Sequence, residues 1–173
     1  MTNIDEVKKE LEEIYKDYLN NEKVKQMQSI NMHRGSNCYI HSFLVAKLSI
    51  KRALRRKRKK LDLKSILIAA ILHDYYLYDW RENRKLLKGH AKRHPFIAAN
   101  NAMNDFNITP FIKDIIESHM WPYNFKYFPK TTEARIVANA DTHIAFKEAM
   151  TSIKHKKKTY NKRMQYIQNL FGE

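Results

Sequence analysis

Six residues of types that commonly bind metal ions occur where the surrounding sequence is apolar or where a predicted helix begins or ends. His73 and Asp74 directly follow the apolar run SILIAAIL, and Asp141 lies inside the apolar segment IVANADTHIAF. A carboxylate in an apolar environment carries a desolvation cost that requires a cation or a metal ion nearby. In chain order the six residues are His41, His73, Asp74, His94, His119 and Asp141.

Together these four imidazoles and two carboxylates suit a pair of divalent transition ions. Adjacent residues at a helix end point about 100° apart, so His73 and Asp74 can both face one centre. The two oxygens of Asp74 could each bind one ion, and a two-metal site neutralises the oxygens of a phosphate ester during in-line displacement. Each histidine alone has a plainer alternative, because a lone imidazole on an apolar face is more often a hydrogen-bonded core residue than a ligand.

Several helices are needed to bring these residues together, and the composition favours an all-α chain. Only 3 glycines and 4 prolines occur among 173 residues, which leaves few points to separate many short strands. The length suits one domain with its own apolar core. Apolar periodicity predicts helices over residues 4–19 and 39–54. A third helix over residues 63–74, capped by Asp62, is apolar nearly all round and should be central and buried.

Four further helices are predicted in the second half of the chain. His94-Pro95 opens a helix that runs to residue 106, and Thr109-Pro110 opens another that runs to residue 120, because proline is favoured in a first helical turn. A sixth helix covers residues 133–150, and a last amphipathic helix covers residues 160–171. Every one of the six metal-type residues therefore lies on a predicted helix or at its end.

The pattern His41, His73-Asp74, His94, His119, Asp141 resembles the HD-domain metal-dependent phosphohydrolases. The local sequences are similar too: YIHSFLVA, AAILHDYYLYDW, HPFIAANNA, IIESHMWP and VANAD. The resemblance covers residues 35–150. It implies a bundle of about five to seven helices with the metal site at its centre. We therefore expect one domain over residues 1–173, with a core of about residues 35–150 on which the terminal helices pack.

The resemblance also implies roles for these residues. His41, His73, Asp74 and Asp141 would bind a first metal ion, and His94 and His119 would bind a second. Asp74 would bridge the two ions. A hydroxide held between the ions would then attack phosphorus. The set is similar to the dinuclear branch of the family, which includes diadenosine-polyphosphate hydrolases, whereas the GYP signature of the cyclic-di-GMP phosphodiesterases is absent.

The identity of the metal stays open at this stage. Four imidazoles disfavour a pure Mg²⁺ site, since Mg²⁺ prefers oxygen ligands and water. Iron, manganese, cobalt, nickel or zinc would each suit the ligand set, and two ions are expected.

Four residues outside the metal set are candidates for contact with the substrate. His33 and Arg34 precede the His41 helix and could hold a phosphate oxygen or protonate a leaving group, since histidine titrates near neutral pH. His90 lies four residues before His94 and could reach the second metal ion or the substrate. Trp121 follows His119 closely and could stack on a nucleobase. For each of them, a surface or packing role is the alternative.

The chain carries 33 basic and 18 acidic residues, a net charge of +15. Such a balance suggests attraction to phosphate, although a solvated basic surface is an equal alternative. The leading prediction is a metal-dependent phosphohydrolase that acts on a nucleotide or a related small phosphate ester or anhydride. The alternative is a nucleic-acid-binding or anion-binding HD-fold protein with little activity, which would use the runs RRKRKK and KHKKK. A hydrolase whose substrate is itself RNA or DNA stays open.

Cellular location is predicted from what the sequence lacks. The single cysteine, Cys38, excludes an intramolecular disulfide, and the N-terminal sequence has no apolar signal core. The longest apolar run is far shorter than the roughly 18 residues of a membrane span. We expect a cytoplasmic protein that does not enter membranes, whose oligomeric state the sequence does not indicate.

Overall fold

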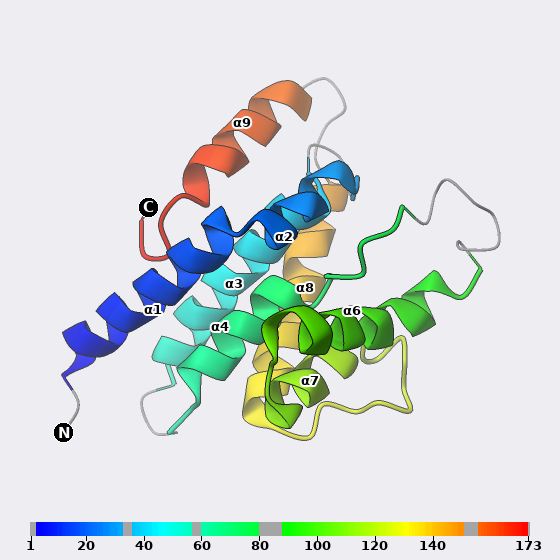
Figure 1. Cartoon of the computed structure of the whole chain (residues 1–173), viewed down its shortest axis with the longest axis horizontal. Coiled ribbons are helices and arrows are strands. Elements are labelled where there is room, and N and C mark those ends of the chain that lie inside the picture. The colour runs from blue at the N-terminus through cyan, green and yellow to red at the C-terminus, as the bar shows by residue number, and fades with distance from the viewer. Residues whose placement is uncertain (1–2, 33–35, 57–59, 80–87, 151–155, 173) are drawn as a thin grey trace.

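The protein is built from helices, as Figure 1 shows for this computed structural model. The structure describes residues 3–32, 36–56, 60–79, 88–150 and 156–172, and within them it contains no strand. The all-α prediction is therefore confirmed. No helix in these ranges is long and apolar enough to cross a membrane. The elements are α1 (Ile4–Asn20), α2 (Glu22–Lys25), the 3-10 helix η1 (Gln26–Ser29), α3 (Cys38–Leu54), α4 (Leu63–Leu72), α6 (His90–Phe106), α7 (Pro110–Glu117), α8 (Thr132–Ala149) and α9 (Lys156–Tyr166).

The apolar helix α4 lies at the centre of the bundle. It packs against α1, α3, α6, α7 and α8, and seven of its ten residues are buried. Its start is fixed by Asp62, whose Oδ1 accepts a hydrogen bond from the backbone N–H of Ser65 at 3.0 Å. The prediction of a central third helix is confirmed. His73 and Asp74 directly follow the C-terminal end of α4 and lie in the core.

Side-chain caps set the starts of the other helices that carry metal-type residues. The carbonyl oxygen of the Asn37 side chain accepts from the N–H of Ile40 at 2.9 Å, which places His41 in the first turns of α3. Thr109 caps α7 in the same way, with Pro110 in the first turn, as predicted. Thr131 caps α8 through the N–H of Ala134 at 3.1 Å.

Helix α6 begins earlier than the sequence predicted. Gly89 has a φ of +78°, which glycine adopts without a steric penalty, and the chain is helical from His90 onward. Pro95 is therefore inside α6 rather than in its first turn. The interpretation of His94-Pro95 as the start of the helix was wrong, because Gly89 already provides a favourable start one turn earlier.

The two ends of the chain also differ from the prediction. The polar segment after α1 contains α2 and η1, because the Asn21 side chain caps a short turn whose Val24 is buried. At the C-terminus, α9 covers Lys156–Tyr166 instead of residues 160–171. The chain after Tyr166 leaves the helix, and Ile167 and Leu170 are buried in the core.

One apolar core extends from α1 to this C-terminal segment. The hydroxyl of Tyr15 donates to the carbonyl oxygen of Ile167 at 2.8 Å, and the N–H of Leu170 donates to a carboxylate oxygen of Glu12 at 3.0 Å. Terminal elements thus pack together on the bundle. The division into a single domain over residues 1–173 stays a prediction.

A buried lysine on α3 holds the C-terminal segment in place. Lys47 is only 6% exposed. Its ammonium group donates to the carbonyl oxygens of Tyr166 at 3.0 Å, of Gly172 at 2.9 Å and of Asn169. The same group lies 4.0 Å from the centre of the Tyr166 ring. No local sequence pattern indicates this contact, because the partners lie more than a hundred residues away.

Replacing Lys47 by methionine is expected to lower the free energy of unfolding by about 2 kcal/mol or more, since three carbonyl groups lose a charged donor. Chemical denaturation measures the loss, and faster amide hydrogen exchange over residues 166–172 locates it. Lys51→Met, at an exposed position one turn further along α3, is the matched control. Equal effects of the two substitutions would contradict the anchoring role of Lys47.

Candidate metal centre

The six predicted metal-type residues come together at one point in the bundle. His41 comes from α3, His94 from α6 and Asp141 from α8, while the other three follow the ends of α4 and α7. Their donor atoms form three overlapping groups whose atoms lie within 4.8 Å of one another. The groups are His41, His73 and Asp74; His73, His119 and Asp141; and Asp74, His94 and His119.

The two carboxylate oxygens of Asp74 face different histidine pairs. Its Oδ2 lies 3.4 Å from Nε2 of His73 and 3.9 Å from Nε2 of His41. Its Oδ1 lies 3.2 Å from Nε2 of His94 and 3.8 Å from Nε2 of His119. A carboxylate that bridges two ions needs this arrangement, with one oxygen directed to each.

Asp141 adds a second carboxylate to the first histidine pair. Its Oδ1 lies 2.9 Å from Nε2 of His41 and 3.7 Å from Nε2 of His73. The pair of His41 and His73 is thus accompanied by one oxygen from each aspartate. Both rings of the His94 and His119 pair face Oδ1 of Asp74, and His119 also shares a donor group with Asp141.

All four imidazoles direct the same nitrogen toward this point. In each ring Nδ1 contacts an oxygen that can only accept a hydrogen bond, so Nδ1 carries the proton and Nε2 faces the carboxylates. Such outer hydrogen bonds orient ligating histidines in metal sites. Nδ1 of His41 donates to Oε2 of Glu148 at 2.8 Å. Nδ1 of His73 donates to the carbonyl oxygen of Ala70 at 2.8 Å, and Nδ1 of His94 donates to that of His90 at 3.1 Å. Nδ1 of His119 donates to the carbonyl oxygen of Ile116 at 2.7 Å.

The donor set fits a bound cation. Nε2 of His94 and Nε2 of His119 are 3.0 Å apart, and Nε2 of His73 is buried with no hydrogen-bond partner among the described residues. With Nδ1 protonated, neutral rings present lone pairs at these positions, and facing lone pairs repel unless a cation or a proton lies between them. Mixed imidazole and carboxylate donors suit divalent transition ions.

The electrostatics keep three of the donors, on His119, Asp141 and Asp74, in forms that can bind metal. Burial lowers the pKa of His41 and of His73, but neighbouring carboxylates outweigh it and raise both, so these two rings must lose a proton when an ion binds. Burial, together with the charges of His73 and His94, lowers the pKa of His119 to about 3, so its ring is neutral near pH 7. Burial raises the pKa of Asp141, but the hydrogen bond to His41 and the nearby charges of His73 and His41 outweigh it and hold that pKa below the usual range. Asp74 is likewise held ionised, because the charge of His73 outweighs burial and leaves the pKa of Asp74 well below the usual range.

Glu148 is a buried residue of the site that the sequence analysis missed. It is 1% exposed, and its Oε2 accepts the hydrogen bond from Nδ1 of His41. Its Oε1 lies 3.5 Å from Nη1 of Arg163. Burial raises the pKa of Glu148, but the charge and hydrogen bond of His41 hold it below its usual value. The seven-residue spacing from Asp141, two helical turns, was a signal that could have identified it.

Replacing Glu148 by glutamine is expected to weaken the affinity for the first metal ion by roughly 10- to 100-fold, because the amide is a poorer acceptor for His41. Competition with a chromophoric chelator measures the affinity. Arg163→Met is the matched control, since it removes another partner of Glu148 and leaves the contact with His41. Unchanged affinity in Glu148→Gln would show that the carboxylate does not orient His41.

A cavity of about 260 Å³ opens next to the cluster. His41, Asp74, His94, His119 and Asp141 lie at one side of it. The other walls are mostly apolar and come from separate segments of the chain. They are formed by Met32, Tyr76, His90, Ala91, Met120 and Ala145.

His90, a predicted substrate contact, lies on the wall of this cavity. Its ring stacks on that of His94 with 4.7 Å between centroids and an interplanar angle of 21°. Its Nδ1 is 2.9 Å from the hydroxyl of Tyr78. If the hydroxyl donates to Nδ1, then Nε2 of His90 carries the proton and can donate to a ligand. The structure thus brings His90 to the site.

The other predicted substrate contacts are not found at the cavity. Trp121 is 37% exposed, does not line it, and packs edge-to-face against Phe128 at 5.3 Å between ring centroids. His33 and Arg34 lie outside the described residues. Their predicted roles stay predictions.

The helical bundle buries four imidazoles and two carboxylates around one point. This arrangement places the protein among helical proteins with a candidate metal site in the core. Residues 38–145, more than half of the chain, match the family model described as HD domain. The chain therefore belongs to the HD-domain metal-dependent phosphohydrolase superfamily, which confirms the resemblance. No curated protein and no solved structure shows significant similarity to the chain.

Proposed function

We propose that this protein is a metal-dependent phosphohydrolase that cleaves a phosphate ester or anhydride of a nucleotide or a related small molecule. One observation carries the proposal: the two oxygens of Asp74 face separate histidine pairs beside a cavity. Membership of the HD superfamily supports the same reaction class.

In this proposal His41, His73, Asp74 and Asp141 hold one ion, and Asp74, His94 and His119 hold the other. Iron, manganese, cobalt, nickel or zinc would suit these donors. Bound divalent ions would supply Lewis-acid stabilisation of the phosphoryl oxygens and a water of lowered pKa.

The residues of the chain orient and enclose the reacting groups. The protonated Nδ1 atoms fix the four rings, and Glu148 fixes His41 most firmly because its acceptor is a carboxylate. His90 is proposed to donate from Nε2 to a phosphate oxygen or to the leaving group. Met32, Met120 and Ala145 line the cavity with apolar surface, which limits the access of water beyond the phosphate.

A nucleotide is the proposed substrate class because the chain carries a net charge of +15, which favours polyanionic ligands. The cavity volume of about 260 Å³ accommodates a phosphate group and part of its leaving group. His33 and Arg34 remain proposed phosphate contacts from the segment that follows Met32.

The test is a substrate screen with defined metals. Metal-free protein is loaded separately with Mn²⁺, Fe²⁺, Co²⁺, Ni²⁺ or Zn²⁺. It is then incubated with p-nitrophenyl phosphate, nucleoside mono-, di- and triphosphates, and dinucleoside polyphosphates. Hydrolysis is expected with at least one transition ion, and Asp141→Asn should abolish it. Rates equal to those of the metal-free protein for every ion and substrate would overturn the proposal.

A further inference from the structure

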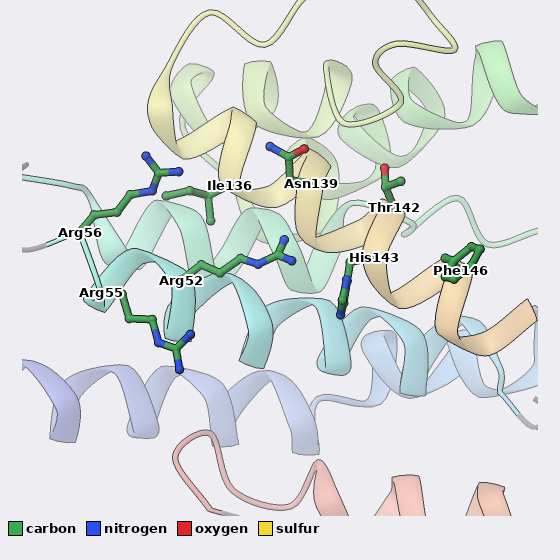
Figure 2. Close-up of a pocket in the computed structure, with 8 residues that line it drawn as sticks. All are labelled: Arg52, Arg55, Arg56, Ile136, Asn139, Thr142, His143 and Phe146. Atoms are coloured by element: carbon green, nitrogen blue, oxygen red, sulfur yellow. The ribbon is translucent and has the colours of Figure 1, made fainter. Parts of the chain in front are cut away.

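A second, larger depression lies on the outer face of the bundle, between α3 and α8. Its volume is about 830 Å³. Figure 2 shows three guanidinium groups at one end, His143 near the middle and Phe146 at the other end. Arg52, Arg55 and Arg56 come from the C-terminal end of α3 and the residues just after it, whereas Asn139, His143 and Phe146 come from α8. Among the residues that the structure describes, none that lines this α3/α8 groove is acidic.

The arginines of the α3/α8 groove bring positive charge that no described lining residue offsets with a carboxylate. Among the described residues, none of the ion pairs formed by lysine or arginine involves Arg52, Arg55 or Arg56. Burial lowers the pKa of His143, and the charges of Lys147 and Arg52 lower it further. Three guanidinium groups at one end of a groove, with no carboxylate among its described lining residues, favour a ligand with more than one negative charge.

The opposite end of the groove presents an aromatic ring to solvent. Phe146 is 68% exposed, although a phenyl ring in water has an unfavourable hydration free energy. The side chain of Asn139 lies between Phe146 and the arginines and can both donate and accept hydrogen bonds. A charged segment followed by an exposed aromatic ring is the arrangement that binds the phosphates and the bases of a single strand.

The dimensions of the groove favour a strand over a single small anion. Ile136 and Phe146, which line its two ends, are ten residues apart on α8, or about 15 Å at a rise of 1.5 Å per residue. Successive phosphates in one strand of a duplex are separated by about 3.4 Å along the axis. Phosphates lie further apart than this in an extended single strand, and the α3/α8 groove is long enough for more than one nucleotide.

The groove and the metal centre use opposite faces of α8. Asp141, Ala145 and Glu148 face the metal centre, whereas His143, two residues from Asp141, is rotated by about 200° around the helix. The described residues that line the α3/α8 groove differ from those that line the cavity at the metal centre. A ligand in the groove would therefore not occupy the metal site.

We propose that the α3/α8 groove binds single-stranded nucleic acid, with Arg52, Arg55 and Arg56 on the phosphates and Phe146 stacked on a base. This binding goes beyond the proposed hydrolase activity and does not depend on it. A flat anionic membrane would not require a groove with an aromatic ring at one end. In the sequence, four further basic residues follow Arg56 and add to the attraction for a polyanion.

The test is fluorescence anisotropy of labelled oligo(U) and oligo(dT) with the full-length, metal-loaded protein over a range of salt concentrations. Arg55→Gln combined with Arg56→Gln is expected to weaken binding at least about tenfold. It should also reduce the slope of log K against log[salt] by about 1.4, or about 0.7 per lost phosphate contact. Phe146→Ala should weaken binding roughly 5- to 100-fold and leave that slope unchanged.

Lys126→Gln combined with Lys130→Gln is the matched control, because it removes the same charge from exposed positions on the α7–α8 loop outside the groove. Circular dichroism and metal content establish that each variant is folded. The proposal is overturned if wild type binds neither oligonucleotide at low salt, or if the control pair weakens binding as much as the arginine pair. It is also overturned if anionic phosphatidylserine vesicles bind through the arginine pair more tightly than either oligonucleotide.

Discussion

Replacing Asp74 by asparagine is expected to lower phosphohydrolase activity by roughly 10³-fold or more, an effect as severe as that of Asp141→Asn. Asparagine preserves the shape of the side chain but has only one acceptor oxygen. One histidine pair would then face an amide NH₂ group instead of Oδ1 or Oδ2 of Asp74. An ion that loses its carboxylate contributes several kcal/mol less stabilisation of the transition state, and each 1.36 kcal/mol is a factor of ten in rate.

The measurement is kcat/KM for the best substrate and metal from the screen, at saturating metal concentration. Asp114→Asn is the matched control, because Asp114 is an exposed carboxylate on α7. The control should retain wild-type activity. Activity of Asp74→Asn within tenfold of wild type would show that the two oxygens of Asp74 do not bridge the reacting centre.

Removal of the metal ions is expected to lower the melting temperature by about 15 °C or more. Each ion present at about a thousand times its Kd stabilises the folded state by roughly 4 kcal/mol. For a domain of this size, 1 kcal/mol corresponds to about 2–4 °C. The chain should remain folded without metal, because protonated imidazoles can then compensate the buried carboxylates. Burial lowers the pKa of His41, but the charge of Glu148 and other contacts outweigh it and raise that pKa well above normal.

Differential scanning calorimetry before and after dialysis against a chelator measures this decrease in melting temperature. Asp74→Asn provides the control, since chelation should change its melting temperature much less than that of wild type. Restoring the metal should restore the wild-type melting temperature. A melting temperature that does not respond to chelation or to added metal would contradict a metal-stabilised core.

Most of the helices could be predicted because their signals are local. The nearly continuous apolar residues of α4 and the caps at Asp62 and Thr109 determine both position and start. The early start of α6 was missed because Gly89 and Pro95 both favour a helix start, and sequence alone does not rank them. The end of α9 was missed because Lys47 binds the carbonyl groups of the C-terminal segment, and that contact joins residues far apart in the chain.

The metal-type residues could be found from the sequence because each lies in an apolar context or at a helix end. Their assignment to two ions stays a prediction, and the positions of the Asp74 oxygens support it. Glu148 was missed because a glutamate near a helix end is usually exposed, and its spacing of two helical turns from Asp141 was not used. It becomes buried only because α8 packs against α3 and because Arg163 approaches from α9.

The α3/α8 groove could be predicted from the sequence even less than Glu148, because helix packing creates it. The basic run that begins at Arg55 is visible in the sequence, but its juxtaposition with Phe146 is not, since the two lie about ninety residues apart. His143 lies two residues after Asp141, so helix geometry alone turns it away from the metal centre without indicating what it faces. The structure places it in the middle of the groove.

The most direct test of the account is the metal content of tag-free wild-type protein, measured by elemental mass spectrometry after saturation with a transition ion and removal of the excess. The account predicts about two ions per chain, because Asp74 directs one oxygen to each histidine pair. A single ion at saturation would contradict the bridged centre. No bound ion, even after reconstitution, would contradict the metal centre altogether.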